Sequence, residues 1–570
     1  MGATDPLTRV RSRLTAQRRR ARADQTPNSA GGFIFQVDDM TRLSRFLTLG
    51  TEGGTYYATE NELTKDNADV VLRLAQSDPT AVVDQIVTIS QAGRAPKQNP
   101  ALFALAAVAG LADEPGRAYA LSHLSQVART GTHLALFASY VQQFRGWGRG
   151  LRRAVGGWYL DKTPDALAYQ VLKYRNRDGW THRDLLRKAH PVTDNPELKR
   201  LFDYVAHRAN APDHATDHAT DQTSDQTTAN RFEDLPGLVG AFEAARTASA
   251  DQLVKLIERH PLSWEMLPDA ALKEPQVWEA LVDKGMPITA LMRQLPRLTR
   301  LGVLTGERRA AVAKRLADPA VLTKGRVHPI SVLVALRTYA SGHGARGQGA
   351  WEPLAQIVDA LDAGFYAAFQ AVEPTGKRTL LALDVSGSMT MPISGMPLTA
   401  REASAALALV TAATEDRHEV VGFTAGRGER SGWNDSAISR LAISPRQRLD
   451  DAIKAVSNLP FRGTDCALPM IWAEREGLEF DTFVVYTDNE TWAGTVHPYQ
   501  ALREYRERTG IPAKLAVVAM TSTGFAIADP DDSGMLDVAG FDAAVPNVVS
   551  DFARAPVAAA PPREGRAETP

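Results

Sequence analysis

Cysteine is nearly absent from this chain of 570 residues and occurs once, at Cys466. A single thiol excludes an intrachain disulfide framework and a cysteine-based structural zinc site. No apolar run approaches the roughly 18 residues that span a bilayer, and the arginine-bearing N-terminus has no apolar stretch of the secretory kind. We therefore expect a cytoplasmic protein. The H-E-x-x-H, P-loop and G-x-S-x-G patterns of common enzymes are missing too, so we expect no enzymatic activity.

A net charge of −1 conceals an uneven distribution of charge along the chain. Residues 9–22 carry seven arginines and no acid, and residues 145–190 hold eleven basic residues against four acids. Residues 376–550 hold sixteen basic residues against twenty-three acids. Basic blocks of this kind favour polyanions such as nucleic acid, although solvated helix faces give the same composition.

The apolar pattern of the first two thirds of the chain is helical. In THLALFASYVQQF (132–144), Leu134, Phe137 and Val141 recur at spacings of three and four, which is one face of a helix. Helices in series predict an α-helical solenoid of stacked pairs over 31–371, preceded by a basic flexible arm at 1–30. The stretch 211–230 is a low-complexity insertion. Its histidines, His214 and His218, could bind a metal, but a surface loop is the simpler interpretation.

From residue 372 to 550 the pattern changes to short, continuously apolar runs. These are TLLALD (379–384), HEVVGFTA (418–425), DTFVVYTD (481–488) and AKLAVVAMT (513–521), and helical stretches lie between them. Such strands alternating with helices predict a doubly wound α/β domain with a mostly parallel sheet. Residues 551–570, rich in alanine and proline, predict a disordered tail.

Oxygen-bearing side chains follow the predicted strands of this domain. The candidates are Asp384, Ser386 and Ser388 in a D-x-S-x-S pattern, Thr464 and Asp465 in a loop, and Asp488. The carboxyl ends of parallel strands share one edge of a sheet, where ligands bind. Carboxylates and hydroxyls are the ligands of a hard cation such as Mg²⁺. The first motif alone could instead form an Asx turn that caps the next helix.

Basic and aromatic side chains alternate in residues 145–191. Arginine and lysine neutralise phosphates, while aromatic faces stack on unpaired bases. If the segment turns from one helix into another, Arg183 and Arg187 lie at i, i+4 on one face. We assign Trp158 and Tyr159 to packing between repeats. Trp147 and Trp180, both next to glycines, fit either packing or binding.

Several long stretches resemble the Ro autoantigen family. GGFIFQVDDMTRLSRFLTLGTEGGTYYATENELTKDN (31–67), RTGTHLALFASYVQQFRGWGRGLRRAVGGWY (129–159) and KYRNRDGWTHRDLLRKAHP (173–191) are similar to its TROVE module. Residues 372–550 resemble a von Willebrand factor A domain with a metal-ion-dependent adhesion site, and FRGTDCALPM (461–470) and YTDNETWAG (486–494) resemble the version in the Ro family.

The resemblance implies HEAT-like helical repeats closed into a ring by the A-type domain. It implies a divalent ion, Mg²⁺, held by Asp384, Ser386, Ser388, Thr464 and Asp488 for contact with a protein and not for catalysis. The implied RNA contacts are Lys173, Arg175, His182, Arg183 and Arg187, together with Arg129 and His133.

The partners that the resemblance implies are RNAs and an enzyme that degrades them. Small noncoding Y-like RNA would bind the outer basic surface, and single-stranded 3′ ends of misfolded RNA would enter a central hole. The protein would then act in RNA quality control, as an adaptor of polynucleotide phosphorylase or another exoribonuclease, with neither a membrane nor DNA as partner. Two alternatives stay open: a metal-dependent protein-interaction adaptor with incidental RNA binding, and a metal-dependent phosphodiesterase that uses Asp384 and Asp488.

Overall fold

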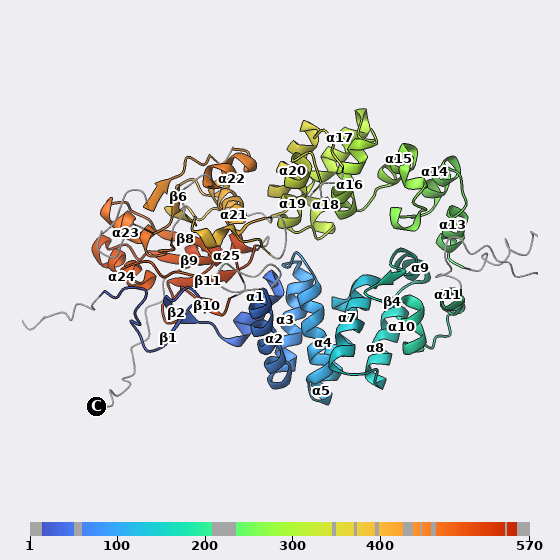
Figure 1. The fold of residues 1–570 in the computed structure, drawn as a ribbon, viewed down its shortest axis with the longest axis horizontal. Coiled ribbons are helices and arrows are strands. Elements are labelled where there is room, and N and C mark those ends of the chain that lie inside the picture. The colour runs from blue at the N-terminus through green and yellow to red at the C-terminus, as the bar shows by residue number, and fades with distance from the viewer. Residues whose placement is uncertain are drawn as a thin grey trace, which may run out of the picture. The chain divides into compact units, whose positions relative to one another are not determined.

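The structure of the protein is a computed structural model with two compact units. It describes residues 14–50, 60–207, 235–344, 349–369, 373–393, 398–425, 437–444, 447–457, 463–521, 523–541 and 544–555. One unit is α/β and is drawn from residues 1–45, 51–66 and 370–570. The other is helical and is drawn from residues 46–50 and 67–369 (Figure 1).

The helical unit is a series of short helices with one small hairpin. Two helices, α1 (Asp39–Leu49) and α2 (Glu60–Ser77), run across the division between the units. The helices that follow are α3 (Pro79–Ala92), α4 (Asn99–Leu111), α5 (Glu114–Ser122), α6 (Leu124–Val127), α7 (Gly131–Phe144), α8 (Arg149–Leu160), α9 (Pro164–Lys173), α10 (His182–Ala189), α11 (Pro196–His207), α13 (Gly237–Ala245), α14 (Ala250–Arg259), α15 (Pro275–Asp283), α16 (Ile288–Arg300), α17 (Gly306–Leu316), α18 (Pro319–Lys324), α19 (Pro329–Ala340) and α20 (Ala355–Ala367). The hairpin is β3 (Asn176–Arg177) and β4 (Trp180–Thr181), and the 3₁₀ turns are η1 (Trp264–Met266) and η2 (Ala271–Lys273).

N-cap residues mark the starts of several of these helices, and the apolar faces of the helices pack against one another. At the starts of α3, α5, α7 and α9, backbone N–H groups donate to the N-cap side chains, which are those of Asp78, Asp113, Thr130 and Thr163. The almost wholly apolar α4 lies against α3, α5 and α7, and α9 lies against α11 and α13. This stacking of neighbouring helices confirms the predicted HEAT-like solenoid.

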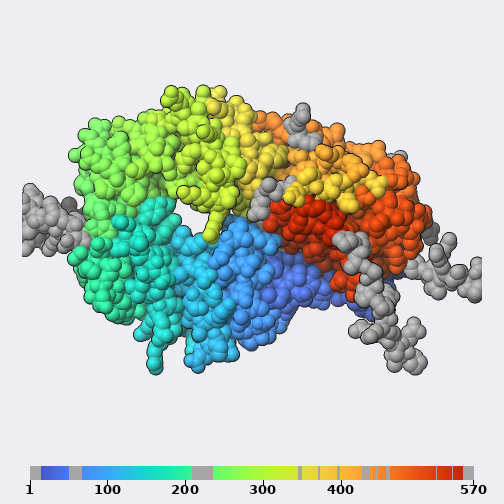
Figure 2. Space-filling model, turned by 180° about the vertical axis from the view of Figure 1, so that it is seen from behind, coloured from blue at the N-terminus to red at the C-terminus, as the bar shows by residue number. Residues whose placement is uncertain are grey.

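Two distant segments of the helical unit meet. His328, the N-cap of α19, lies with its Nε2 3.2 Å from the carbonyl oxygen of Arg94, just after α3. Figure 2 shows an opening through the helical unit beside the segment coloured yellow-green, which carries α18 and α19. The helical unit therefore makes a contact across its own interior. Closure of a ring by the α/β unit stays a prediction.

The α/β unit is built on a six-stranded sheet in the order β11-β9-β8-β5-β6-β7. The strands are β5 (Thr379–Asp384), β6 (His418–Phe423), β7 (Ile438–Arg440), β8 (Thr482–Thr487), β9 (Lys514–Ala519) and β11 (Met535–Ala539). All neighbours are parallel except β7, which is antiparallel to β6. The remaining elements are the 3₁₀ turn η3 (Gly387–Thr390) and the helices α21 (Ala400–Thr414), α22 (Leu449–Ser457), α23 (Leu468–Arg475), α24 (Pro498–Thr509) and α25 (Val545–Arg554).

Every residue of β5, β8 and β9 is buried, as expected for central strands covered on both faces. The doubly wound, mostly parallel sheet predicted from the apolar runs is thus confirmed.

A second, three-stranded sheet joins the N-terminal segment to this unit. The strands β1 (Gln25–Pro27) and β2 (Phe33–Gln36) pair antiparallel, and β2 also pairs with β10 (Phe525–Ala526). The prediction of a loose arm over 1–30 is therefore wrong for residues 14–30. Its arginines suggested solvent, but Gln17 is 0% exposed and Asn28 is also buried, and both are hydrogen-bonded to the α/β unit.

The low-complexity insertion predicted at 211–230 lies outside the described residues, and so does the tail from residue 556 onward. Helix α25 continues to Arg554, past the position where the tail was expected to begin. Within the described part of the chain, no helix is both long and apolar enough to cross a membrane.

Candidate nucleic-acid interface and metal centre

The basic stretch 145–191 folds into α8, α9, the β3–β4 hairpin and α10. The expected helix-to-helix turn is a two-residue hairpin turn, because Asp178 and Gly179 both have positive φ, 48° and 75°. Thr181 then starts α10 with a capping box that it shares with Asp184. The hairpin and α10 both lie against neighbouring helices, β4 against α7 and α10 against α8.

His182 lies in the interior and not on the surface of this region. Its Nδ1 is 2.8 Å from the hydroxyl of Tyr159, and its ring packs over Gly131, where a Cβ would lie 2.7 Å from Nε2. Burial, and then the charge of Lys162, lower the pKa of His182 to about 4. The ring is therefore neutral at physiological pH and 4% exposed. The ring packs with Tyr159, one of the two aromatics assigned to packing, and its predicted contact with RNA stays a prediction.

Lys173 and Arg175 hold parts of the helical unit together. The Lys173 ammonium lies 3.7 Å from Glu265 and 3.1 Å from the hydroxyl of Tyr169, and its side chain is 9% exposed. The Arg175 guanidinium lies over the ring of Phe242 at 5.2 Å. These two cations already have partners within the unit, so their predicted contact with RNA would require them to exchange or share those partners.

Arg183 and Arg187 lie on the outward side of α10. Arg187 is exposed, while Arg183 is half-buried with its Nε unpartnered among the described residues. Exposed basic side chains that sequence reasoning missed lie beside them. These are Lys188 on α10 and Arg149, Arg152 and Arg153 on the neighbouring α8. Within the described ranges none of these residues has an ion pair. We call this set, Arg149, Arg152, Arg153, Arg183, Arg187 and Lys188, the α8–α10 basic surface.

Arg129 and His133 lie near the contact between the two distant segments. The Arg129 guanidinium donates to the carbonyl and hydroxyl oxygens of Ser90, at 2.7 and 3.1 Å. Burial, and then repulsion by Arg326, lower the pKa of Arg129. Burial, and then Arg129, lower the pKa of His133 to about 4, so its ring is neutral. Whether either residue touches RNA stays a prediction.

The predicted oxygen ligands meet at the carboxyl edge of the parallel sheet. Asp384 ends β5 and Asp488 directly follows β8. The hydroxyl oxygens of Ser386 and Ser388 lie 2.9 Å apart, and all five predicted ligands, Asp384, Ser386, Ser388, Thr464 and Asp488, are at most 2% exposed. The Asx turn considered as an alternative also exists, because Asp384 Oδ1 accepts the Ser386 N–H at 2.8 Å. The two interpretations are compatible.

The chemistry of this cluster fits a hard cation. Thr464 Oγ1 and Asp488 Oδ2 are buried and have no hydrogen-bond partner among the described residues. Burial, and then the charge of Asp488, raise the pKa of Asp384, and burial raises that of Asp488. A divalent ion would satisfy the open oxygens and offset both desolvated carboxylates. The described residues contain no group of three or more His, Cys, Asp or Glu side chains suited to a metal, so any ion here depends on hydroxyls.

The N-terminal segment supports the loop that carries Asp488. Gln17 donates from Nε2 to Asp465 at 2.8 Å and to the Val496 carbonyl at 2.9 Å, and it accepts the Thr491 hydroxyl at 2.6 Å. Asp465 is therefore engaged away from the cluster, which leaves Thr464 as the ligand candidate of its loop. No sequence pattern pairs a glutamine with a loop more than 440 positions away.

Together, stacked helical repeats and an α/β domain with oxygen ligands at its strand ends define a helical-repeat protein joined to a von Willebrand factor A-type domain. The TROVE domain profile matches residues 26–338 and the Ro60 vWA domain profile matches residues 378–553. The chain belongs to the Ro family of TROVE-domain proteins.

Relatives of nearly full length support this assignment. RNA-binding protein RO60 of Deinococcus radiodurans is 40% identical over 565 residues, 97% of this chain and 99% of the relative. RNA-binding protein RO60 of Caenorhabditis elegans is 36% identical and covers 95% of this chain and 92% of its own length. The crystal structure of the Deinococcus radiodurans RO (RSR) protein matches with a TM-score of 0.65 and 40% identity, over 91% of this chain and 99% of that one.

Proposed function

We propose that this protein binds structured noncoding RNA in the cytoplasm through the α8–α10 basic surface and has no catalytic activity of its own. The observation that carries the proposal is a group of cations, all but the half-buried Arg183 exposed, that have no ion pair within the described residues and lie beside the Trp147–Trp180 pair. Unpaired cations bind phosphates without first giving up a protein partner. The printed names of both relatives, RNA-binding proteins, support the same function.

The finer proposal follows the resemblance to the Ro family. Y-like RNA binds the outer surface, and single-stranded 3′ ends of misfolded RNA enter the opening in the helical unit. Arg129 and Arg326 supply positive charge near the contact that crosses the unit. The protein then serves RNA quality control, as an adaptor for polynucleotide phosphorylase or another exoribonuclease.

We further propose that Asp384, Ser386, Ser388, Thr464 and Asp488 hold Mg²⁺. The open oxygens of Thr464 and Asp488 support this assignment. When bound, the ion supplies a Lewis-acidic position for a carboxylate of a partner protein. The chain's own residues shape the site: Arg401 donates to the carbonyls of Val385 and Ser386, at 2.7 and 2.9 Å, and fixes the loop that carries the serines.

The same cluster favours a second candidate function, a metal-dependent protein adaptor whose RNA binding is incidental. One experiment tests whether the metal centre and the RNA surface act independently. Asp384→Asn should abolish a metal-dependent protein contact and leave RNA affinity unchanged if RNA binding is independent of the metal. Loss of RNA binding on chelation of divalent ions would contradict the RNA surface assigned here, because that surface holds phosphates without the metal.

The test of the RNA surface is a charge reversal with a matched control. Arg183→Glu with Arg187→Glu should weaken binding of a structured RNA and reduce the slope of log K against log salt by about 1 for each lost phosphate contact. The matched control is Lys255→Glu with Arg259→Glu, which reverses two positive charges at the same i, i+4 spacing on exposed positions of α14. Equal losses in both pairs would indicate general electrostatics, and no loss in the first pair would refute the site.

A further inference from the structure

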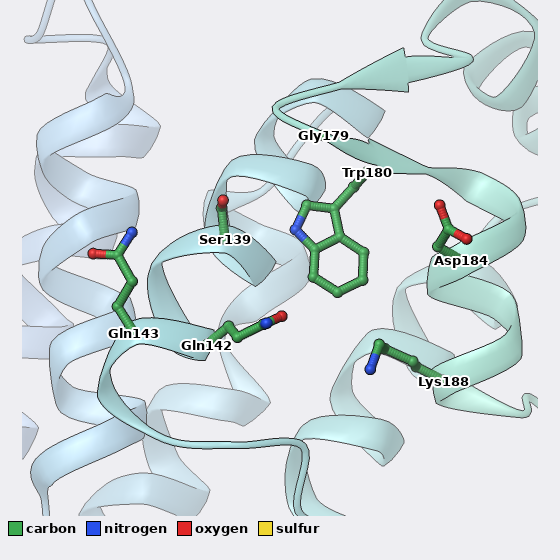
Figure 3. Close-up of a pocket in the computed structure, with 7 residues that line it drawn as sticks. All are labelled: Ser139, Gln142, Gln143, Gly179, Trp180, Asp184 and Lys188. Atoms are coloured by element: carbon green, nitrogen blue, oxygen red, sulfur yellow. The ribbon is translucent and has the colours of Figure 1, made fainter.

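A pocket of about 630 Å³ opens between α7, the β3–β4 hairpin and α10. Figure 3 shows the indole of Trp180 pointing into it, between Ser139 and Gln142 of α7 on one side and Asp184 and Lys188 of α10 on the other. A volume of this size lies within the about 300–1,000 Å³ of small-ligand sites. The fold of the helical unit alone builds this pocket.

Trp180 supplies the aromatic wall of the pocket, and Trp147, which is not one of the lining residues, lies against Trp180. The ring centroids of Trp147 and Trp180 lie 5.6 Å apart and the ring planes are inclined at 50°, so the two indoles are in contact but are not stacked face to face. Both are half-buried, and the indole N–H of Trp147 is buried with no acceptor among the described residues. A tryptophan that only fills a core usually pairs its N–H, as Trp158 does with the Ala128 carbonyl at 2.5 Å.

The rest of the lining is polar. The Lys188 ammonium lies 5.4 and 5.8 Å from the centroids of Trp147 and Trp180, and it is exposed. The exposed amides of Gln142 and Gln143 carry donors and acceptors that no described residue engages. Asp184 Oδ2 accepts the backbone N–H and the hydroxyl of Thr181 in the cap of α10. Because an ionised carboxylate has no donor, Asp184 can only accept hydrogen bonds from a ligand in the pocket.

We propose that this pocket binds one unpaired nucleobase of the RNA, stacked on Trp180, and that it prefers bases with an exocyclic amino group over uracil. This inference rests on the proposed RNA-binding function. The base takes the position of the Lys188 ammonium on the ring, and the ammonium moves on its flexible stem to the phosphate of the same nucleotide. Amino groups of adenine, guanine or cytosine donate to Asp184, while the amides of Gln142 and Gln143 read the other edge atoms.

The chemistry of the lining favours a base over other occupants. An aromatic face with one cation fits a flat, polarisable ring attached to a phosphate. Negative charge from Asp184 opposes a free phosphate ion or an acidic peptide as sole ligand. The position also fits, because Arg183 and Arg187 on the same helix lie beside it and can hold the flanking phosphates.

The first experiment leaves the protein unchanged and alters the RNA. A structured RNA that binds the wild-type protein is prepared with its unpaired nucleotides replaced by abasic ones, position by position. At the nucleotide that enters the pocket we expect a loss of about tenfold in affinity, and a smaller loss when uridine replaces the native base. If no abasic position weakens binding, the base pocket is refuted while the RNA function stands. If the wild-type protein binds none of the RNAs, the proposed function itself fails.

Variants then assign the effect to the pocket. Trp180→Ala should lose about tenfold for RNA with the unpaired base and nothing for fully paired RNA, and Trp180→Phe should recover most of the loss because it restores an aromatic face. Val192→Ala removes an 86% exposed apolar side chain outside the pocket and should behave like the wild type. If Trp180→Ala loses as much affinity for paired RNA as for RNA with the unpaired base, the proposal is overturned. It is also overturned if the abasic substitution lowers the affinity of Trp180→Ala as much as it lowers the affinity of the wild type.

Discussion

Acid should destabilise the helical unit through His182, because this ring is buried in its neutral form. The pKa of His182 in the folded protein is about 4, against an ordinary value of 6.5. The unfolded chain therefore binds a proton as pH falls below about 6.5, while the folded chain does not until about 4. The stability that this difference provides is present above about pH 6.5 and is lost as pH falls toward 4.

The magnitude follows from the two pKa values. Between about pH 7.5 and about pH 5, proton binding stabilises the unfolded state by about 2 kcal/mol per ring and the folded state by about 0.1 kcal/mol or less. His328 has the same pair of pKa values and is also buried, so it should add a similar loss. The two rings are in separate parts of the unit, and their contributions should add.

The assay is urea unfolding of the whole protein, followed by far-ultraviolet circular dichroism, at the two pH values. His182→Gln cannot titrate, so its stability should fall by about 2 kcal/mol less than that of the wild type over this range. His207→Gln, which alters an exposed ring on α11, is the matched control and reports any general effect of replacing an imidazole by an amide. If His182→Gln falls as much as the wild type, the ring is protonated in the folded protein, and its exclusion from the RNA-binding surface is wrong.

Three further predictions concern the α/β unit. Arg45 is 1% exposed and pairs with Asp537, so Arg45→Ala should cost about 3–5 kcal/mol, measured by thermal unfolding, and a cost below about 1 kcal/mol would contradict a buried pair. A Cβ at Gly32 would lie 2.0 Å from the Thr491 carbonyl oxygen, so Gly32→Ala should detach the N-terminal segment and speed its cleavage in limited proteolysis; unchanged cleavage would contradict the packing. Mg²⁺ at 100 times its dissociation constant should stabilise the protein by about 2.7 kcal/mol, and Asp384→Asn should remove that gain; a gain retained by the variant would place the ion elsewhere.

The parts of the fold that depend on local pattern could be predicted from the sequence. Continuous apolar runs indicated the central parallel strands, and β5 ends at Asp384 as its run does. Because parallel strands share one carboxyl edge, the predicted oxygens of Asp384, Thr464 and Asp488 could be brought together without coordinates. Helical spacing likewise predicted α7 and its buried face of Leu134, Phe137 and Val141.

The sequence also contains the information that separates inward-facing from outward-facing RNA candidates on α10. His182, Leu185, Leu186 and Ala189 are the buried residues of α10, at the spacing of a single helix face. That spacing already indicated that His182 faces inward and that Arg183 and Arg187 do not. The Asp-Gly pair at 178–179 is a hairpin signal as well, and it predicts the β3–β4 turn better than a simple turn between helices does.

Other features depend on contacts between distant parts of the chain. Lys173 pairs with Glu265, which lies far along the chain in the 3₁₀ turn η1. The sequence around Lys173 does not predict this ion pair. The N-terminal segment is similar: its composition is that of a solvated arm, yet Gln17 is buried by hydrogen bonds to the loop after β8. Composition describes the average of a segment, whereas these contacts depend on single side chains.

The most direct test of the central claim, that RNA is held on the α8–α10 basic surface, is ultraviolet cross-linking of the protein isolated with its RNA from its own cells. Mass spectrometry should place RNA adducts within residues 145–191, and sequencing of the attached RNA should return structured noncoding species. A particle that carries no RNA after gentle isolation, or adducts confined to residues 378–553, would contradict the account.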